Sequence, residues 1–104
     1  MERYSVIVER PAEADLRGIL RYITDTLKEP ATARRIYSSI RATILGLDTF
    51  PLRNRVVSDE PYAAQGVRIA LAENYLVFYV ADEAAHTVHV LRVLHGRREW
   101  QSIL

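Results

Sequence analysis

The strongest constraint on the fold is the run Tyr75–Val80, in which every side chain is apolar. Aromatic and β-branched residues dominate it, and so short a run is typical of a strand that is covered on both faces. Large apolar residues alternate at 67–71 before it, and a further extended run covers 88–94 after it. The short connections at 72–74 and 81–85 predict that these three strands form an antiparallel meander, with Tyr75–Val80 at its centre.

The segment before the meander predicts one strand and two amphipathic helices. Residues 4–9 alternate as a strand with one buried face, and Pro11 is well placed to begin a helix that should run to about Lys28. A second helix should begin at Pro30 and end near Phe50. Because the break between the helices is short, they should fold back as a hairpin whose shared face covers the sheet.

The predicted fold class is therefore α+β, with the order β-α-α-β-β-β and the helical hairpin packed on a twisted antiparallel sheet. Residues 52–65 show no periodicity and should form a long loop, in which Val56 and Val57 could make a short edge strand. The residues expected in the core are Leu16, Ile19, Ile23, Ile36, Ile40, Leu47, Val77, Tyr79 and Val90.

The composition limits the class of protein. A chain of 104 residues is expected to be one domain, spanning residues 1–104. No apolar run approaches the roughly 20 residues that cross a bilayer, and the start, MERYSVIVERPAEAD, carries charges where a signal peptide is apolar. The sequence has no cysteine, which removes disulfides and thiolate chemistry. We therefore expect a cytoplasmic protein without membrane contact.

The net charge of +1 is far from the strongly basic balance of a protein that lives on nucleic acid. The basic residues are nevertheless unevenly placed, because Arg34, Arg35 and Arg41 share the polar side of the second helix. Two interpretations remain open for them: a solvated face, or a docking surface for an acidic partner.

The histidines do not predict a metal site. His86 and His89 are three residues apart and would point to opposite faces of one strand, while His89 and His95 would lie about 20 Å apart. The four glycines are scattered and form no phosphate-binding loop. No metal and no cofactor are predicted.

The end of the predicted sheet gathers cations around a histidine. The segment RVLHGRREW covers residues 92–100, and Arg68 stands on another strand of the same meander. Arginines can hold a phosphate and a histidine can move the proton of an attacking or leaving oxygen, so this end could handle a phosphodiester. Alternatively, His95 only ends a strand and Trp100 only closes the core. The candidate residues are Arg68, Arg92, His95, Arg97, Arg98 and Trp100.

Four segments, taken in order, form a longer pattern. They are YSVIVERPAEADLRGILRYI, EPATARRIYSSI with LDTFP, GVRIALAENYLVFYV, and VHVLRVLHGRREW. Their order and spacing resemble the RelE/ParE superfamily of bacterial type II toxins over nearly the full length. The resemblance implies the same fold and a cognate antitoxin of ParD or RelB type, which wraps the toxin in a hetero-oligomeric complex and silences it.

The superfamily has two functional branches. RelE-like members are ribosome-dependent endoribonucleases that cut mRNA, whereas ParE-like members bind and inhibit DNA gyrase. Ribonuclease members commonly carry an arginine just before the Leu-Val-Tyr of the central strand, and here that position is Tyr75. The RVLHGRRE ending and the modest charge favour a ParE-like plasmid-stabilisation toxin. An mRNA endoribonuclease, which would be an enzyme, and a toxin-like domain without activity are the alternatives.

Together with their charge and position, the resemblance gives the candidate residues the following expected roles. Catalysis would fall to Arg68, His95 and Arg97 in the RelE-like alternative only. In either branch, Arg34, Arg35 and Arg41 would bind the antitoxin together with the sheet edge. The residues expected to bind the target are Arg92, Arg97, Arg98 and Trp100.

Overall fold

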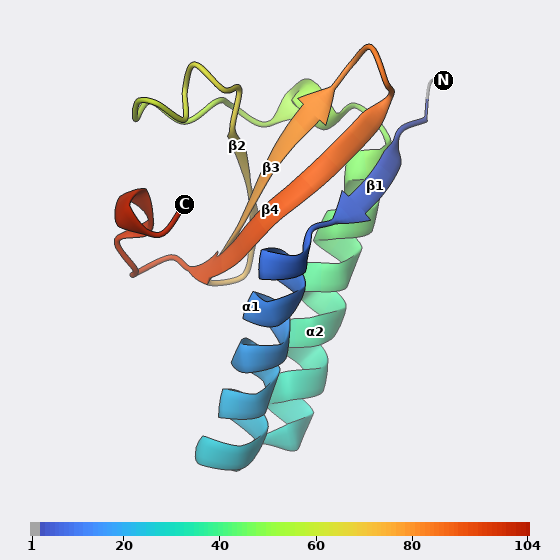
Figure 1. Ribbon diagram of the computed structural model, residues 1–104. Helices are drawn as coiled ribbons and strands as arrows, with labels where there is room; N and C mark the ends of the chain where they lie inside the picture. The colour runs from blue at the N-terminus through green and yellow to red at the C-terminus, as the bar shows by residue number, and fades with distance from the viewer. Residues whose placement is uncertain (1–2) are drawn as a thin grey trace.

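In the computed structural model, a helical hairpin packs against one face of a four-stranded sheet (Figure 1). The structure describes residues 3–104, so Met1 and Glu2 of the predicted domain lie outside it. The order of helices and strands confirms the predicted α+β fold. The elements are β1 (Ser5–Val8), α1 (Arg10–Arg21), α2 (Pro30–Leu45), β2 (Arg68–Ala72), β3 (Tyr75–Asp82) and β4 (Thr87–His95).

The sheet has the strand order β1-β4-β3-β2 and is mixed. As predicted, β3 lies in the interior and runs antiparallel to both β2 and β4. However, β1 runs parallel to β4, with Ser5 opposite Thr87 and Val8 opposite Val90, so the expectation of a wholly antiparallel sheet is wrong for this pair. The polypeptide passes from β1 to β2 through two helices rather than a hairpin turn, so these two strands can run in the same direction. Because β2 and β4 are both antiparallel to β3, β1 is then parallel to β4 as well.

The first helix changes character before it ends. The α-helix stops at Arg21, short of the predicted Lys28, and a π-helical segment, Tyr22–Thr26, continues it. The wider turn of a π-helix admits an extra residue, and π segments are frequent at functional sites. Here Ile23 is buried in the core while Tyr22 is 55% exposed. No helix within residues 3–104 combines the length and apolarity that crossing a membrane requires.

Both faces of the central strand are covered, as its apolar run predicted. The face toward the hairpin buries most of the expected core, whereas Leu16 and Ile19 are only half-buried against it. On the other face, Phe78 and Leu94 form a second, smaller core with Val57 and Val67. The predicted core residues that are buried are Ile23, Ile36, Ile40, Leu47, Val77, Tyr79 and Val90.

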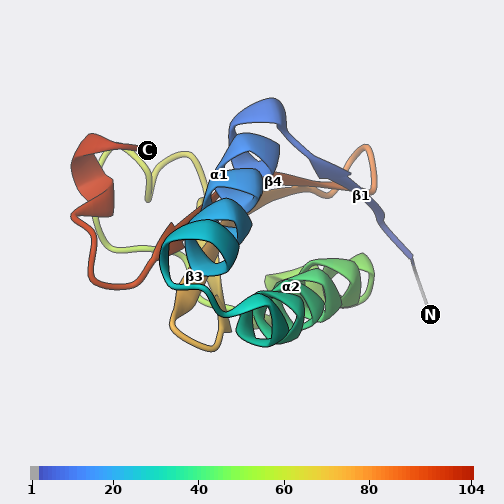
Figure 2. The ribbon, with the colours of Figure 1, turned by 90° about the horizontal axis from the view of Figure 1, so that it is seen from below.

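The second core is closed by the C-terminal tail, residues 96–104, and by the long loop (Figure 2). The ring of Trp100 lies 5.1 Å from that of Phe78 and 6.0 Å from that of Tyr62, measured between centroids. The Tyr62 hydroxyl donates to the Gln101 carbonyl at 2.9 Å. In the loop, the expected edge strand at Val56 is reduced to an isolated bridge with Arg68.

Candidate functional site

Arg92 is partly buried, and its guanidinium is held by neighbouring residues. Its Nε and Nη2 donate to the two carboxylate oxygens of Asp15 on α1, at 2.7 and 2.8 Å, and its Nη1 donates to the Ile103 carbonyl at 3.2 Å. The Val93 backbone N–H donates to the same carboxylate at 3.0 Å. The hydrogen bonds that Arg92 donates to Asp15 raise the pKa of Arg92. Arg92 therefore joins β4, α1 and the C-terminal tail, and its guanidinium is occupied.

Arg68 is also occupied, and it lies far from His95. Its Nη1 donates to the carbonyls of Leu52 and Asn54, at 3.2 and 2.5 Å, and so fixes the start of the long loop. Arg68 stands opposite Tyr79, whereas His95 stands opposite Tyr75. At about 3.3 Å per residue, these two positions on β3 are roughly 13 Å apart. The structure does not bring the proposed catalytic residues Arg68 and His95 together.

His95 and Arg98 do come together, in a surface hollow beside α1. We call this the aromatic hollow; it has a volume of about 410 Å³. The rings of Tyr75 and His95 meet edge to face, with centroids 5.3 Å apart. Burial and the neighbouring charge of Glu73 raise the pKa of the Tyr75 hydroxyl. The lining residues are Ala14, Asp15, Gly18, Ile19, Tyr22, Tyr75, Val93, Leu94, His95 and Arg98.

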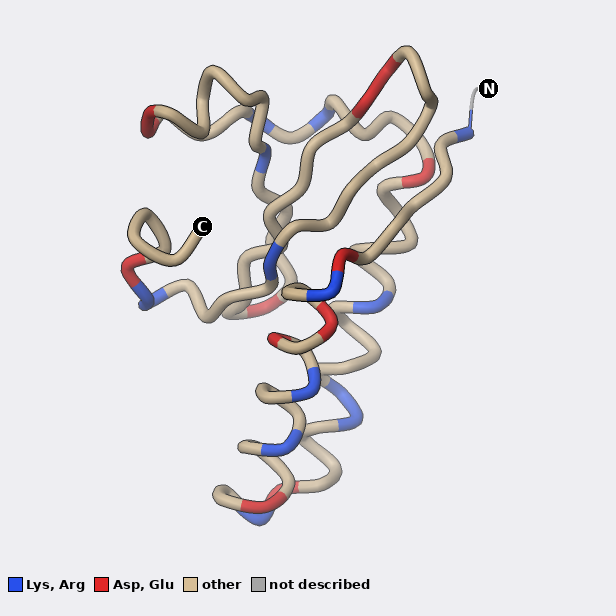
Figure 3. Tube along the Cα trace, viewed as in Figure 1, with Lys and Arg blue, Asp and Glu red and all other residues tan. Residues whose placement is uncertain are grey.

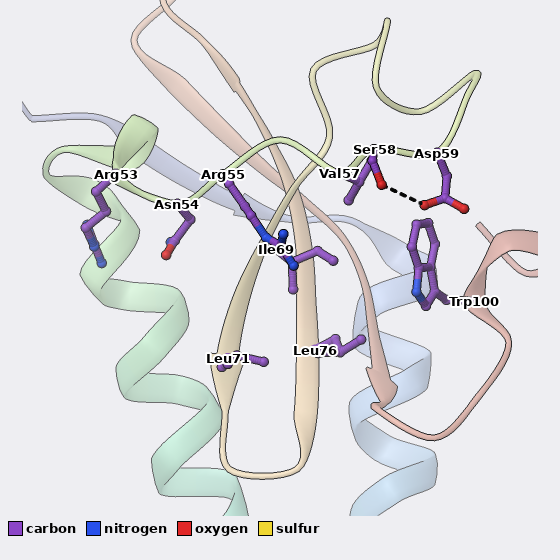
Figure 4. A pocket seen from close by; sticks show the side chains of 10 residues that line it. All are labelled: Arg53, Asn54, Arg55, Val57, Ser58, Asp59, Ile69, Leu71, Leu76 and Trp100. Atoms are coloured by element: carbon purple, nitrogen blue, oxygen red, sulfur yellow. Dashed lines mark hydrogen bonds between the residues drawn. The ribbon is translucent and has the colours of Figure 1, made fainter.

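A larger depression, the outer cleft, lies on the opposite face of the sheet beside β2 (Figure 4). Its volume is about 780 Å³. Ile69 and Leu71 on β2 and Leu76 on β3 form its floor, with Leu71 as much as 71% exposed. Trp100 forms one wall, so the tail that closes the second core also borders the cleft (Figure 4).

The rim of the outer cleft is polar and offers one free guanidinium. Arg53 donates to the carbonyls of Gly46, Thr49 and Phe50 at the end of the helical hairpin. Arg55 makes no hydrogen bond or ion pair within residues 3–104. The cleft lining contains no histidine, and Asp59 is its one carboxylate. This arrangement suits the binding of an apolar group with an acidic neighbour better than acid–base chemistry.

A third surface, the hairpin groove, runs between the two helices. Its walls are mainly apolar, and its charged lining residues are Arg17, Arg41 and Glu13. Figure 3 shows that basic residues recur along both helices. Of the three arginines predicted to bind the antitoxin, Arg41 lines the groove, Arg34 is exposed outside its lining, and Arg35 forms an ion pair with Glu73 at the β2–β3 turn. The apolar lining residues are Val8, Leu16, Leu20, Tyr37, Ile44 and Leu45.

Comparisons with known proteins agree with this architecture. The family model described as the ParE toxin of the type II toxin–antitoxin system parDE matches residues 6–100. A chain of the RelBE2 toxin–antitoxin complex from Mycobacterium tuberculosis is 28% identical, with a TM-score of 0.67 over 91% of this chain and 93% of that one. A chain of the chromosomal ParDE system from P. aeruginosa has the same fold, at 21% identity and a TM-score of 0.71 over 89% and 96%. No curated protein sequence gives a significant match.

Proposed function

Because the chain belongs to the family of ParE toxins of type II toxin–antitoxin systems, we propose that it stops growth in the cytoplasm by binding DNA gyrase and not by cutting RNA. The observation that carries this proposal is the apolar floor of the outer cleft. Binding a phosphodiester requires cations or hydrogen-bond donors. The floor residues Ile69, Leu71 and Leu76 provide neither, and the free guanidinium of Arg55 stands only at the rim. The residue before Leu76 is Tyr75, where ribonuclease members of the superfamily commonly carry arginine.

The same cleft supports contact with a protein target. A half-exposed aromatic wall beside an apolar floor is the type of pocket that takes an anchoring side chain of a partner. Trp100 supplies the wall, and Arg55 is available for an acidic group beside the anchor. Arg97 and Arg98 are exposed in the same tail and fit the role of target contacts, whereas Arg92 is not available for it.

We expect the purified toxin to inhibit DNA supercoiling by gyrase without cleaving RNA. In cells that express it without antitoxin, incorporation of labelled thymidine should fall within minutes, before incorporation of labelled methionine.

The double variant Arg97→Ala/Arg98→Ala should lose growth inhibition while its thermal stability is kept, because both side chains are exposed. Cleavage of mRNA and an earlier loss of translation would instead indicate a ribonuclease.

The partner that silences this toxin is proposed to be a small acidic antitoxin seated in the hairpin groove. Two of the similar solved structures are toxin–antitoxin systems, and one is a complex of the two proteins. The groove leaves Tyr37 and Leu45 partly exposed, at 41% and 48%. An amphipathic helix or extended segment could bury these residues and place its carboxylates near Arg17 and Arg41.

The double variant Tyr37→Ala/Leu45→Ala should bind the co-encoded antitoxin about 10- to 100-fold more weakly, because truncating apolar anchors at the centre of an interface costs affinity of this order. Isothermal titration calorimetry measures the change. Leu27→Ala is the matched control, since Leu27 is also an exposed leucine, at 44%, but lies outside the groove lining. Unchanged affinity in the double variant would contradict this placement of the antitoxin.

A further inference from the structure

We propose that a second copy of this chain docks on an exposed apolar surface just after α2, so that the toxin without its antitoxin forms a twofold dimer. This surface, the Phe50 patch, surrounds a pocket of about 650 Å³ that is lined by Tyr4, Phe50, Pro51, Leu52 and Arg53. It shares no lining residue with the hairpin groove or the aromatic hollow, and only Arg53 with the outer cleft. The proposal therefore does not depend on the identity of the growth-inhibition target.

Phe50 combines high exposure with an unfavourable backbone conformation. Its side chain is 67% exposed, the largest exposed fraction of any aromatic residue within 3–104. Its backbone lies in the left-handed region, with φ 47° and ψ 53°, where a bulky side chain is a rare outlier. Strain of this kind is concentrated at functional sites, because folding alone does not favour it. The exposed ring of Phe50 is therefore a candidate contact residue.

Hydrogen bonds hold the backbone around Phe50 in place. The Arg53 guanidinium donates to three carbonyls of the segment 46–50, including that of Phe50 itself. On the other side of Phe50, the buried Tyr79 hydroxyl donates to the Pro51 carbonyl at 2.6 Å. The position of the ring is thus fixed before any partner arrives, which reduces the conformational entropy lost on binding.

The shape of the Phe50 patch is complementary to itself. In a twofold dimer both copies use the same surface, so that surface has to supply both a projecting group and a site that receives it. The patch has an exposed ring beside an apolar pocket, and Leu52 on the pocket wall is 41% exposed. Across a twofold axis, each Phe50 ring meets the pocket of the other copy. Burial of these side chains on both copies removes apolar surface from water, which drives association.

The charges at the rim of the Phe50 patch favour a second copy over an acidic partner. Arg3 precedes Tyr4, Asp48 lies two residues before Phe50, and the two charged side chains form an ion pair at 2.7 Å. Both signs therefore lie together, and a twofold axis can place the Arg3 of each copy beside the Asp48 of the other. Arg53, the one charged residue of the pocket lining, is occupied by backbone carbonyls. An acidic antitoxin or a nucleic acid would find no unoccupied cation in this lining.

Sedimentation velocity of the purified full chain, freed of antitoxin, tests the proposal. The unmodified protein should form a dimer that dissociates on dilution through the micromolar range. Phe50→Asp should weaken the dimer by about 100-fold or more, because the new carboxylate would be buried without a partner. Phe50→Gly should weaken it by about tenfold or more and leave the melting temperature unchanged, since relief of the left-handed strain offsets the greater entropy of the unfolded chain.

Matched controls come from the π-helical segment at the turn of the helical hairpin. Tyr22→Asp changes another exposed aromatic residue, at 55%, and should leave the dimer intact. Because the chain has no cysteine, one introduced thiol reports on one place. A short bis-maleimide should cross-link two copies through Thr49→Cys, beside Phe50, and not through Thr26→Cys in the π-helical segment. A monomer at all concentrations, a dimer that Phe50→Asp does not weaken, or equal cross-linking at both positions would overturn the proposal.

Discussion

A toxin with the substitution Leu71→Asp should fold normally and no longer inhibit growth. Leu71 is 71% exposed on the edge strand β2, so a carboxylate at this position costs the isolated protein little. In the proposed complex it would place a charge in the floor of the outer cleft, against an apolar anchor of the target. We expect the concentration that inhibits gyrase to rise by about 100-fold or more, since burying an unpaired charge costs several kcal/mol.

Viable counts after induction and a supercoiling assay measure this effect, and thermal denaturation confirms the fold. Ile7→Asp is the matched control, because Ile7 is an exposed branched residue, at 44%, on the opposite edge strand β1. The control should remain toxic. Full toxicity of Leu71→Asp would show that the outer cleft does not contact the target.

Replacing Asp15 by alanine should lower the free energy of unfolding by about 2 to 3 kcal/mol, the usual cost of leaving partly buried donors without their acceptor. The side chains of Asp15 and Arg92 are only 12% and 24% exposed. The variant leaves the Arg92 guanidinium and the Val93 N–H without their acceptor. It also removes the hydrogen bonds that join α1 to β4. Urea denaturation monitored by circular dichroism measures the loss.

The matched control for this prediction is the exposed ion pair between Arg3 and Asp48. Their side chains are 73% and 30% exposed, and Arg3 Nη1 lies 2.7 Å from Asp48 Oδ2. Arg3→Ala should change stability by about 1 kcal/mol or less. The double variant Asp15→Ala/Arg92→Met should recover part of the loss, because it leaves no unpaired charge. Equal effects of Asp15→Ala and Arg3→Ala would show that the Asp15–Arg92 pair contributes no more than a surface pair.

The elements of the fold could be predicted because their signals are local. The apolar run Tyr75–Val80 indicated an interior strand, and proline together with three-and-four spacing indicated the helices. The direction of β1 could not be predicted, since its neighbour β4 begins about eighty residues later and alternation is the same in parallel and antiparallel strands. The π-helical turn at Tyr22–Thr26 likewise has no signature in the pattern of apolar residues.

The sites were harder to predict because they depend on distant partners. Arg92 resembles a free recognition residue until its carboxylate partner, 77 positions earlier, is known. Arg68 is occupied by two backbone carbonyls, and no side-chain pattern reveals such bonds. The floor of the outer cleft did leave a signal in the sequence, because the large side chain of Leu71 alternates with the small ones of Ala70 and Ala72. Leu71 lies on the face of β2 that the second core covers only in part.

The strand order has a consequence for how the protein is made. β4 lies between β1 and β3, although β1 is synthesised first and β4 last of the four strands. While the nascent polypeptide is still shorter than 87 residues, β1 lacks β4, the strand with which it pairs. The second core also lacks Leu94 and Trp100 at this stage. Such long-range pairing forms late, after the loop between the two strands has been closed. A prematurely terminated product therefore contains the complete helical hairpin and lacks both Trp100 of the outer cleft and His95 of the aromatic hollow.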